Sequence, residues 1–462
     1  MDLNRELEII ELIKKEVKPA LGCTEPIAVS LAVARSCEAL REIGAEVGSV
    51  LVEVSANILK NGMGVGIPGT GMVGLHIASA LAVTCGRSEY GLEVLKDLSA
   101  EAIAAAKEMV DAGRVKVVLA ETPLKLYIKA WAYSGGPAAW DAEVAGSGAG
   151  VMAFPAHSAY TEIANNLYSI VSVVRYGVVL VGASGADASG DVASDKQAAG
   201  ASAEKTTLDY KLSVKEILQF AREASFENIE FILDSVKLNK ALADAGLNED
   251  YGLKVGKTIM AREHSSVFGS SVMTYAMAAT AAASDARMAG CTLPAMSNSG
   301  SGNQGITVTM PVIAVAEKMG VGDEQLARAL VLSHLVAIHI KGYLGKLSAL
   351  CGCVIASTGS SCGIVYLKGG NYEQVCSAIK NMIGNITGMV CDGAKVGCAL
   401  KVASGVSSSI QAAVLALDNI CISSNDGIIE DCIEKTICNL GRIGAEGMQT
   451  TDKMILDIMV CK

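Results

Sequence analysis

The sequence lacks several features that would point to common protein classes. Its 462 residues include 14 cysteines but no Cys-x-x-Cys pair, so the usual spacing of zinc and ferredoxin sites is absent. Basic residues form no cluster, and 38 Lys and Arg against 48 Asp and Glu give a net charge of -10. This balance disfavours a general role in binding nucleic acid or anionic membranes.

Aromatic residues are also scarce, at 4% of a chain that is 51% hydrophobic. The apolar content is mostly Ala, Val, Ile, Leu and Met, mixed with 48 Gly and many Ser, which predicts tightly packed buried helices. Charge-free stretches at 265–284, 289–316 and 347–367 are interrupted by polar residues and lack basic flanks, so we expect no membrane span. The charged N-terminus is unlike a signal peptide, and we expect a cytoplasmic protein with reduced cysteines.

Hydrophobic periodicity predicts an α+β fold: a mixed N-terminal half with a small sheet and a mostly α-helical C-terminal half. The stretch 185–205, rich in Gly, Ala, Ser and Asp, is the candidate linker, which suggests domains at 1–205 and 206–462. In the first domain we expect helices at 3–17, 24–43, 72–85 and 99–112, strands at 48–55, 115–120, 124–133 and 141–145, and helix or strand over 165–183. A turn at 121–123 would join the second and third strands. In the second domain we expect helices at 213–225, 227–245, 253–262, 270–288, 306–319, 323–341, 372–386 and 405–417.

Two glycine loops, at 64–69 and 300–305, formally match G-x-G-x-x-G. The first contains Pro68, the second follows a predicted helix, and neither ends in G-K-[ST], so we expect no dinucleotide or phosphate loop. The second loop is the more informative, because it is long and polar and leads directly into an apolar helix. A helix N-terminus with local hydroxyl and amide groups suits a carboxylate, whereas the alternative is a simple polar turn with a glycine-rich cap. The candidate substrate-binding residues are Ser297, Asn298, Ser299, Ser301, Asn303 and Gln304.

Three cysteines occur in contexts typical of metal ligands: Cys23 in Gly-Cys-Thr-Glu-Pro, Cys351 in Leu-Cys-Gly-Cys and Cys391 in Val-Cys-Asp-Gly. Cys353 is an alternative to Cys351, because both lie in one short turn. Most other cysteines lie in helical or apolar patterns, where a free cysteine is usually a small buried hydrophobe. An iron–sulfur cluster held by three cysteines would leave one iron open as a Lewis acid.

Four segments together carry a family resemblance: 22–26, 297–305, 341–353 (KGYLGKLSALCGC) and 389–395 (MVCDGAK). Over nearly its whole length the chain resembles the iron–sulfur-dependent L-cysteine desulfidases, which are relatives of the catalytic domain of bacterial iron–sulfur L-serine dehydratases. Only the stretch around 185–205 looks like an insertion. The resemblance implies a [4Fe-4S] cluster on Cys23, Cys351 and Cys391. It also implies breakdown of L-cysteine to pyruvate, ammonia and hydrogen sulfide without pyridoxal phosphate.

The implied reaction is a β-elimination, in which the open iron binds the substrate thiolate and a base removes the α-proton. Lys341 is the first candidate for the base, because we expect it on the same helix or turn as Cys351 and desolvated. Glu25 is the second, with a first-turn helix acid as the alternative, and His339 is the third. Lys60 and Asn61 beside the first glycine loop are further candidate substrate contacts.

The penultimate residue, Cys461, has two interpretations. The apolar tail could bring its thiol to the open iron when substrate is absent, or it could dock with the thiol touching nothing. In either case the expected partner is L-cysteine, with no nucleic acid or membrane, and a homodimer is the candidate assembly. The alternatives are an L-serine dehydratase with the same cluster and a non-enzymatic iron–sulfur sensor or electron carrier, although a carrier normally uses four ligands.

Overall fold

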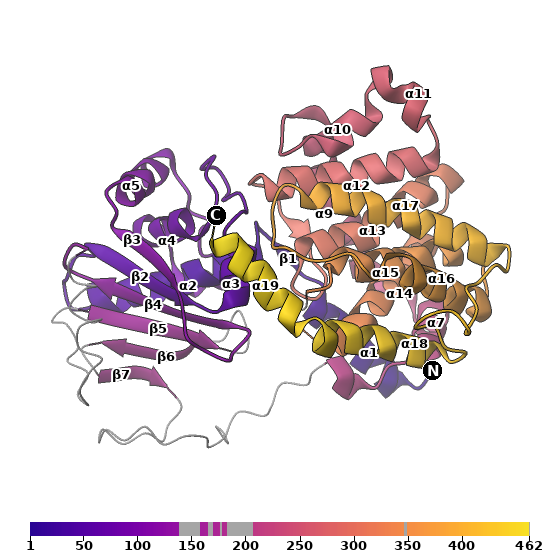
Figure 1. The fold of residues 1–462 in the computed structure, drawn as a ribbon, viewed down its shortest axis with the longest axis horizontal. Helices are drawn as coiled ribbons and strands as arrows, with labels where there is room; N and C mark the ends of the chain where they lie inside the picture. Colours follow the sequence, from indigo (N-terminus) through magenta and orange to yellow (C-terminus); the bar gives the residue numbers. More distant parts are fainter. Residues whose placement is uncertain (138–157, 165–169, 176–177, 183–206, 346–348, 462) are drawn as a thin grey trace. The chain divides into compact units, whose positions relative to one another are not determined.

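The computed structural model describes the chain except residues 138–157, 165–169, 176–177, 183–206, 346–348 and 462 (Figure 1). Two compact units are present, one formed by residues 23–204 and the other by residues 1–22 together with 205–462. The fold is α+β, as predicted from the sequence. The sequence-based division placed the N-terminal helix in the first domain, whereas in the structure α1 (Leu3–Glu16) packs within the helical unit. There Arg5 pairs with Glu216 at 2.7 Å and donates to the carbonyl of Tyr210.

The unit of residues 23–204 is built on a six-stranded sheet with the order β3-β2-β4-β5-β6-β7. Among the strand pairs that the structure describes here, only β2–β3 is parallel. The strands expected at 115–120 and 124–133 are β3 and β4, and β2 lies between them in the sheet, so they are not hydrogen-bonded neighbours. The ambiguous stretch 165–183 is strand wherever it is described, the strand expected at 141–145 lies outside the described residues, and β5 was not anticipated. The strands are β2 (Ser49–Val54), β3 (Val115–Leu119), β4 (Tyr127–Tyr133), β5 (Ser158–Ala164), β6 (Ile170–Arg175) and β7 (Val178–Gly182).

Helix α2 (Thr24–Arg41) packs along this sheet, against β2, β4, β5 and β6. It is buried over most of its length, and the Ser36 hydroxyl donates to the carbonyl of Ala130 at 2.8 Å. Pro26 lies in its first turn, where a missing N–H costs nothing. The remaining helices are α3 (Ala56–Gly62), α4 (Leu75–Thr84), which packs on α2, and α5 (Ala100–Asp111), which packs on α4. Cys23, at the N-cap of α2, is therefore fixed by the first turn of a buried helix.

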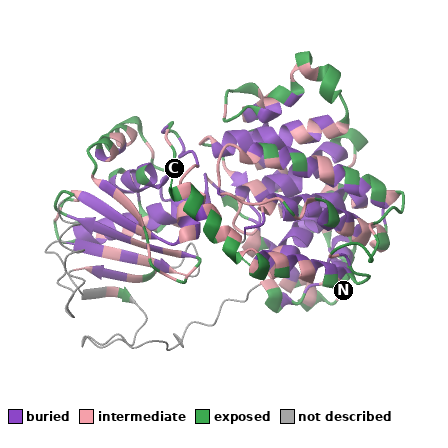
Figure 2. Ribbon diagram, in the orientation of Figure 1, coloured by how far each residue is buried: buried purple, intermediate pink, exposed green. Residues whose placement is uncertain are grey.

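The second unit is helical apart from a short antiparallel pair, β1 (Pro19–Ala20) with β8 (Ala295–Met296). Figure 2 shows that α13, α14 and α15 form its buried centre. Helices α15, α18 and α19 were not predicted, and α13 and α17 begin earlier than expected. The helices are α7 (Val214–Glu223), α8 (Phe226–Ile229), α9 (Asp234–Asn248), α10 (Val255–Met260), α11 (Ser265–Phe268), α12 (Val272–Met288), α13 (Gly302–Met319), α14 (Asp323–Leu344), α15 (Gly352–Leu367), α16 (Tyr372–Ile386), α17 (Cys398–Leu417), α18 (Ile433–Arg442) and α19 (Gln449–Val460).

Small residues allow the central helices to approach closely, as the composition suggested. A Cβ added to Gly359 on α15 would lie 2.3 Å from the carbonyl oxygen of Ser333 on α14. Among the described residues one helix, α17, is long and apolar enough to cross a membrane. It packs against α12, α15 and α16, and half of its apolar stretch is buried inside the unit. Its apolar character is accounted for by this packing.

Candidate active site

The polar loop at 297–305 closes tightly onto the N-terminus of α13. Asn298 and Ser301 form an isolated antiparallel bridge across a turn in which Ser299 has φ 48° and Gly300 has φ 76°. Ser301 is the N-cap of α13, and its hydroxyl accepts from the N–H of Gln304 at 3.3 Å. The helix thus begins at Gly302, four residues before the predicted start. A helix N-terminus carries partial positive charge, which favours a bound carboxylate.

The six predicted loop side chains divide into an inner and an outer set. Ser297, Asn298 and Gln304 are buried and hydrogen-bonded within the protein, Ser297 to the carbonyl of Lys18 at 2.6 Å and Gln304 to Asn298 at 2.6 Å. The outer set is half-buried and comprises Ser299, Ser301 and Asn303. The outer set is therefore the part of the loop that is open to a ligand, while the inner set holds the loop in place.

His334 on α14 supports the inner set and was not singled out from the sequence. Asn298 Nδ2 lies 3.0 Å from His334 Nδ1 and donates to it, which leaves the imidazole proton on Nε2. The ring is fully buried, and Nε2 has no hydrogen-bond partner among the described residues. Burial lowers the pKa of His334 to about 3, so the ring is neutral at physiological pH. A lone histidine in an apolar helix gives no sequence signal that separates this role from simple core packing.

Arg287 on α12 is a second residue that sequence reasoning missed. Its guanidinium is 3% exposed, donates to the carbonyl of Gly22 at 2.8 Å and contacts Asn303 Oδ1 at 3.3 Å. A Cβ added to Gly302 would lie 2.2 Å from Arg287 Nε, so the guanidinium occupies the space that a side chain would need. Arg287 thus links the polar loop to Gly22, the residue that precedes Cys23.

Cys351 and Cys391 lie diagonally across two short antiparallel segments. Leu350 pairs with Val390, the N–H of Cys351 donates to the carbonyl of Met389 at 3.0 Å, and the N–H of Cys391 donates to the carbonyl of Ala349 at 2.7 Å. Cys351 is also the N-cap of α15. Burial, followed by the charges of nearby cysteines, raises the pKa of the Cys351 thiol well above its ordinary value. A thiol in such a setting is inert unless a cation compensates its charge.

Cys353, the alternative ligand, has a different environment. Its thiol is buried, donates to the carbonyl of Lys401 at 3.1 Å and lies 3.6 Å from Ser357 Oγ. A Cβ on Gly405 would come within 2.5 Å of the sulfur. Cys353 therefore fills the contact between α15 and α17, and the geometry favours Cys351 of the pair.

Glu25 and Asn61 are brought together in the unit of residues 23–204. Asn61 Nδ2 donates to one carboxylate oxygen of Glu25 at 3.1 Å, and the Thr24 hydroxyl donates to the other at 3.1 Å. Lys60, the neighbour of Asn61 on α3, is 2% exposed. These residues surround the N-terminus of α2, so the carboxylate nearest in sequence to Cys23 has a fixed orientation.

The other candidate bases are positioned differently from expectation. Lys341 lies near the end of α14 and is half-buried, while Cys351 caps the next helix, so the expected shared helix or turn is wrong. His339 Nε2 contacts Glu434 Oε2 at 2.7 Å, and its ring packs edge-on against Tyr343. Burial raises the pKa of Glu434, but the hydrogen bond and charge of His339 outweigh it, so the pKa is lowered. His339 is a satisfied core residue.

No group of three or more His, Cys, Asp or Glu side chains within the described residues has the arrangement of a metal site. Two of the three predicted ligands, Cys351 and Cys391, belong to the helical unit, whereas Cys23 belongs to the other. The two thiols nevertheless fit a cluster in their chemistry, because thiolates are the soft donors that iron–sulfur ligation requires.

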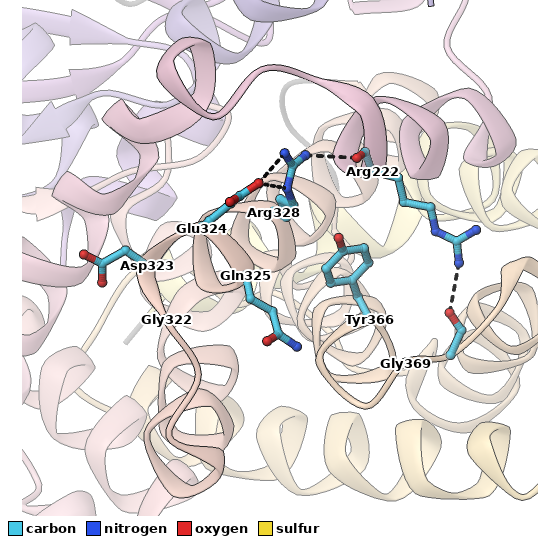
Figure 3. Close-up of a pocket in the computed structure, with 9 residues that line it drawn as sticks. Arg222, Gly322, Asp323, Glu324, Gln325, Arg328, Tyr366 and Gly369 are labelled. Atoms are coloured by element: carbon cyan, nitrogen blue, oxygen red, sulfur yellow. Dashed lines mark hydrogen bonds and ion pairs between the residues drawn. The ribbon is translucent and has the colours of Figure 1, made fainter.

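A pocket of 690 Å³ lies elsewhere, at the first turn of α14 and the last turn of α15 (Figure 3). Lys341 and Cys351 lie at the opposite ends of these two helices. The Arg328 guanidinium lines the pocket but is held by Glu324 and by three carbonyls at the end of α7. Arg222 donates to the carbonyl of Gly370 at 3.1 Å. The two arginines thus satisfy backbone carbonyls at the end of α7 and after α15, and the pocket is separate from the candidate active site.

The chain matches the family model described as serine dehydratase alpha chain over residues 89–457. It therefore belongs to this family, and the family indicates a serine dehydratase-like lyase. Among similar proteins, a UPF0597 protein of Bacteroides fragilis is 45% identical over 456 residues, covering 98% of both chains. UPF0597 proteins of Oleidesulfovibrio alaskensis and Parabacteroides distasonis are 47% and 46% identical, covering 98% and 100% of this chain and 97% and 100% of their own.

Proposed function

We propose that the protein catalyses β-elimination of L-cysteine to pyruvate, ammonia and hydrogen sulfide. The backbone pairing of the Cys351 and Cys391 segments carries this proposal, because it holds two soft donors diagonally across one short antiparallel pair, in the unit that contains the polar loop. Family membership supports the lyase class, and cysteine is proposed as the substrate because the motifs at 22–26 and 341–353 resemble those of the L-cysteine desulfidases.

The proposed cofactor is a [4Fe-4S] cluster, which suits a family that is typically iron–sulfur dependent. Cys23, Cys351 and Cys391 would hold it, and when bound it would supply one open iron as a Lewis acid for the sulfur of the substrate. The amino acid would be bound at its other end by the protein itself. Ser299, Ser301 and Asn303 at the N-terminus of α13 would orient its carboxylate.

The base would remove the Cα proton, and the Cβ–S electron pair would leave as sulfide. Glu25 is the better-supported base, since Thr24 and Asn61 orient its carboxylate, and Lys341 remains the second candidate. The resulting aminoacrylate would take a proton at Cβ to become an imine. Water would then hydrolyse the imine to pyruvate and ammonia, so that atoms and charges balance.

Anaerobic reconstitution with iron and sulfide, followed by assays on L-cysteine and L-serine, tests the proposal. Replacing Cys23, Cys351 or Cys391 by Ala should abolish iron binding and sulfide release together. Cys353→Ala is the matched control, and it should keep its iron, since its thiol donates to a carbonyl. A higher kcat/KM for serine than for cysteine would make the protein a serine dehydratase. Bound iron without turnover of either would favour the sensor.

A further inference from the structure

Lys401 on α17 contacts the Cys391 segment on both sides of the cysteine. Its ammonium group donates to the carbonyl of Val390 at 2.8 Å and forms an ion pair with Asp392. These contacts span one residue in each direction, so the backbone of Cys391 is held between them. Hydrogen bonds from a charged donor are stronger than neutral ones, which makes this clamp substantial.

The main chain of Lys401 reaches the other cysteine segment. Its carbonyl accepts from the Cys353 thiol at 3.1 Å, two residues after Cys351. One residue of α17 therefore ties together the two segments that present Cys351 and Cys391. In the described chain, the pair of Leu350 with Val390 is the only isolated β-bridge between these segments. The contacts of Lys401 therefore add to a short stretch of backbone pairing.

The charge of Lys401 is also placed for a role beside sulfur. Its ammonium group is paired with the carboxylate of Asp392, the residue that follows Cys391. The ammonium group is half-buried, where solvent screens it less than at the surface. A fixed cation next to sulfur ligands stabilises the added negative charge when a cluster is reduced.

We propose that Lys401 is a positioning residue that keeps Cys391 in register with Cys351 and holds a positive charge beside the ligands of the cluster. The inference rests on the proposed function for the identity of the cluster, but the register itself can be measured without it. Lys401→Met should lower the iron and sulfide bound per chain, shorten the lifetime of the cluster in air and lower its reduction potential. Lys401→Arg should restore the potential, since it keeps the charge.

Lys395 offers the matched control, because it also pairs with Asp392 and contacts the carbonyl of Asp392 at 3.3 Å. Lys395→Met removes one cation from the same carboxylate while leaving the contact between Lys401 and Val390. It should therefore retain more iron and a longer cluster lifetime than Lys401→Met.

Amide hydrogen exchange in the full-length apoprotein provides the readout that needs no cluster. Lys401→Met should speed exchange of the Cys391 N–H by about 10-fold, since a contact to a charged donor is lost. Unchanged exchange, potential and iron content would overturn the inference, even if the melting temperature fell. If the wild-type protein itself binds no iron, the proposed function fails, and faster exchange in the variant would still support the positioning role.

Discussion

Replacing Arg287 by Met tests whether the buried guanidinium organises the candidate site. The change removes the donor to Gly22 and the contact to Asn303, and leaves one buried and one half-buried acceptor without this partner. Each such bond to a charged group contributes about 1.5–3 kcal/mol, and the two are not fully additive, so we expect a loss of about 3 kcal/mol in unfolding free energy. Asn303 also loses its anchor, and we expect KM for L-cysteine to rise about 10-fold, equivalent to about 1.4 kcal/mol.

Urea denaturation of the apoprotein would measure the first effect, and anaerobic steady-state kinetics the second. Arg328→Met is the matched control, because Arg328 is also held by backbone carbonyls but lies at the far end of α14. It should reduce stability and leave KM unchanged. Gly302→Ala should mimic the KM effect, since its methyl group displaces the guanidinium. The reasoning would be refuted by an Arg287→Met variant with wild-type KM, or by a stability loss below about 1 kcal/mol.

Two further predictions concern pH and the tail. The pKa of His334 falls from its ordinary value of 6.5 to about 3 on folding. The folded state with a neutral His334 therefore has its full free energy of unfolding above pH 6.5, and this free energy decreases as the pH falls from 6.5 toward 3. This loss should amount to about 2 kcal/mol at pH 5, and His334→Gln should flatten that part of the urea-denaturation profile; parallel profiles would refute the assignment. Cys461 lies exposed at the end of α19, and removal of residues 461–462 should leave the cluster assembled, speed its loss in air and lower KM if the thiol caps the open iron. An equal oxygen lifetime and equal kinetics would favour the docked tail that touches nothing.

Local hydrophobic periodicity was sufficient to predict the elements whose own residues alternate or repeat regularly. The amphipathic helix at 3–17 and the β-branched strand at 48–55 were confirmed within a few residues as α1 and β2. The separation of β3 from β4 in the sheet was not predicted, because strand order depends on β2, which lies more than 60 residues earlier in the sequence. Helix α15 was missed because its Gly and Ser residues have low helix propensity and are stabilised only by packing.

The residues of the candidate site likewise differ in whether nearby sequence was enough to identify them. Motifs identified the polar loop and the cysteines, since their residue types carry the chemistry. They did not identify His334 or Arg287, whose partners Asn298 and Gly22 lie 36 and 265 residues away in sequence. They also did not separate Cys351 from Cys353, a choice that depends on the position of α17.

The assignment of residues 1–22 to the helical unit has a consequence for folding during synthesis. The N–H groups of Ser297 and Ser299 donate to the carbonyls of Lys18 and Glu16, so the register of the polar loop depends on a segment made before the intervening 182 residues, 23–204. The N-terminal segment is made before residues 23–204 but reaches the polar loop only after about 280 further residues, a contact of very high sequence separation. The unit of residues 23–204 is inserted into the sequence of the helical unit, and its synthesis is finished before that of residues 205–462 begins.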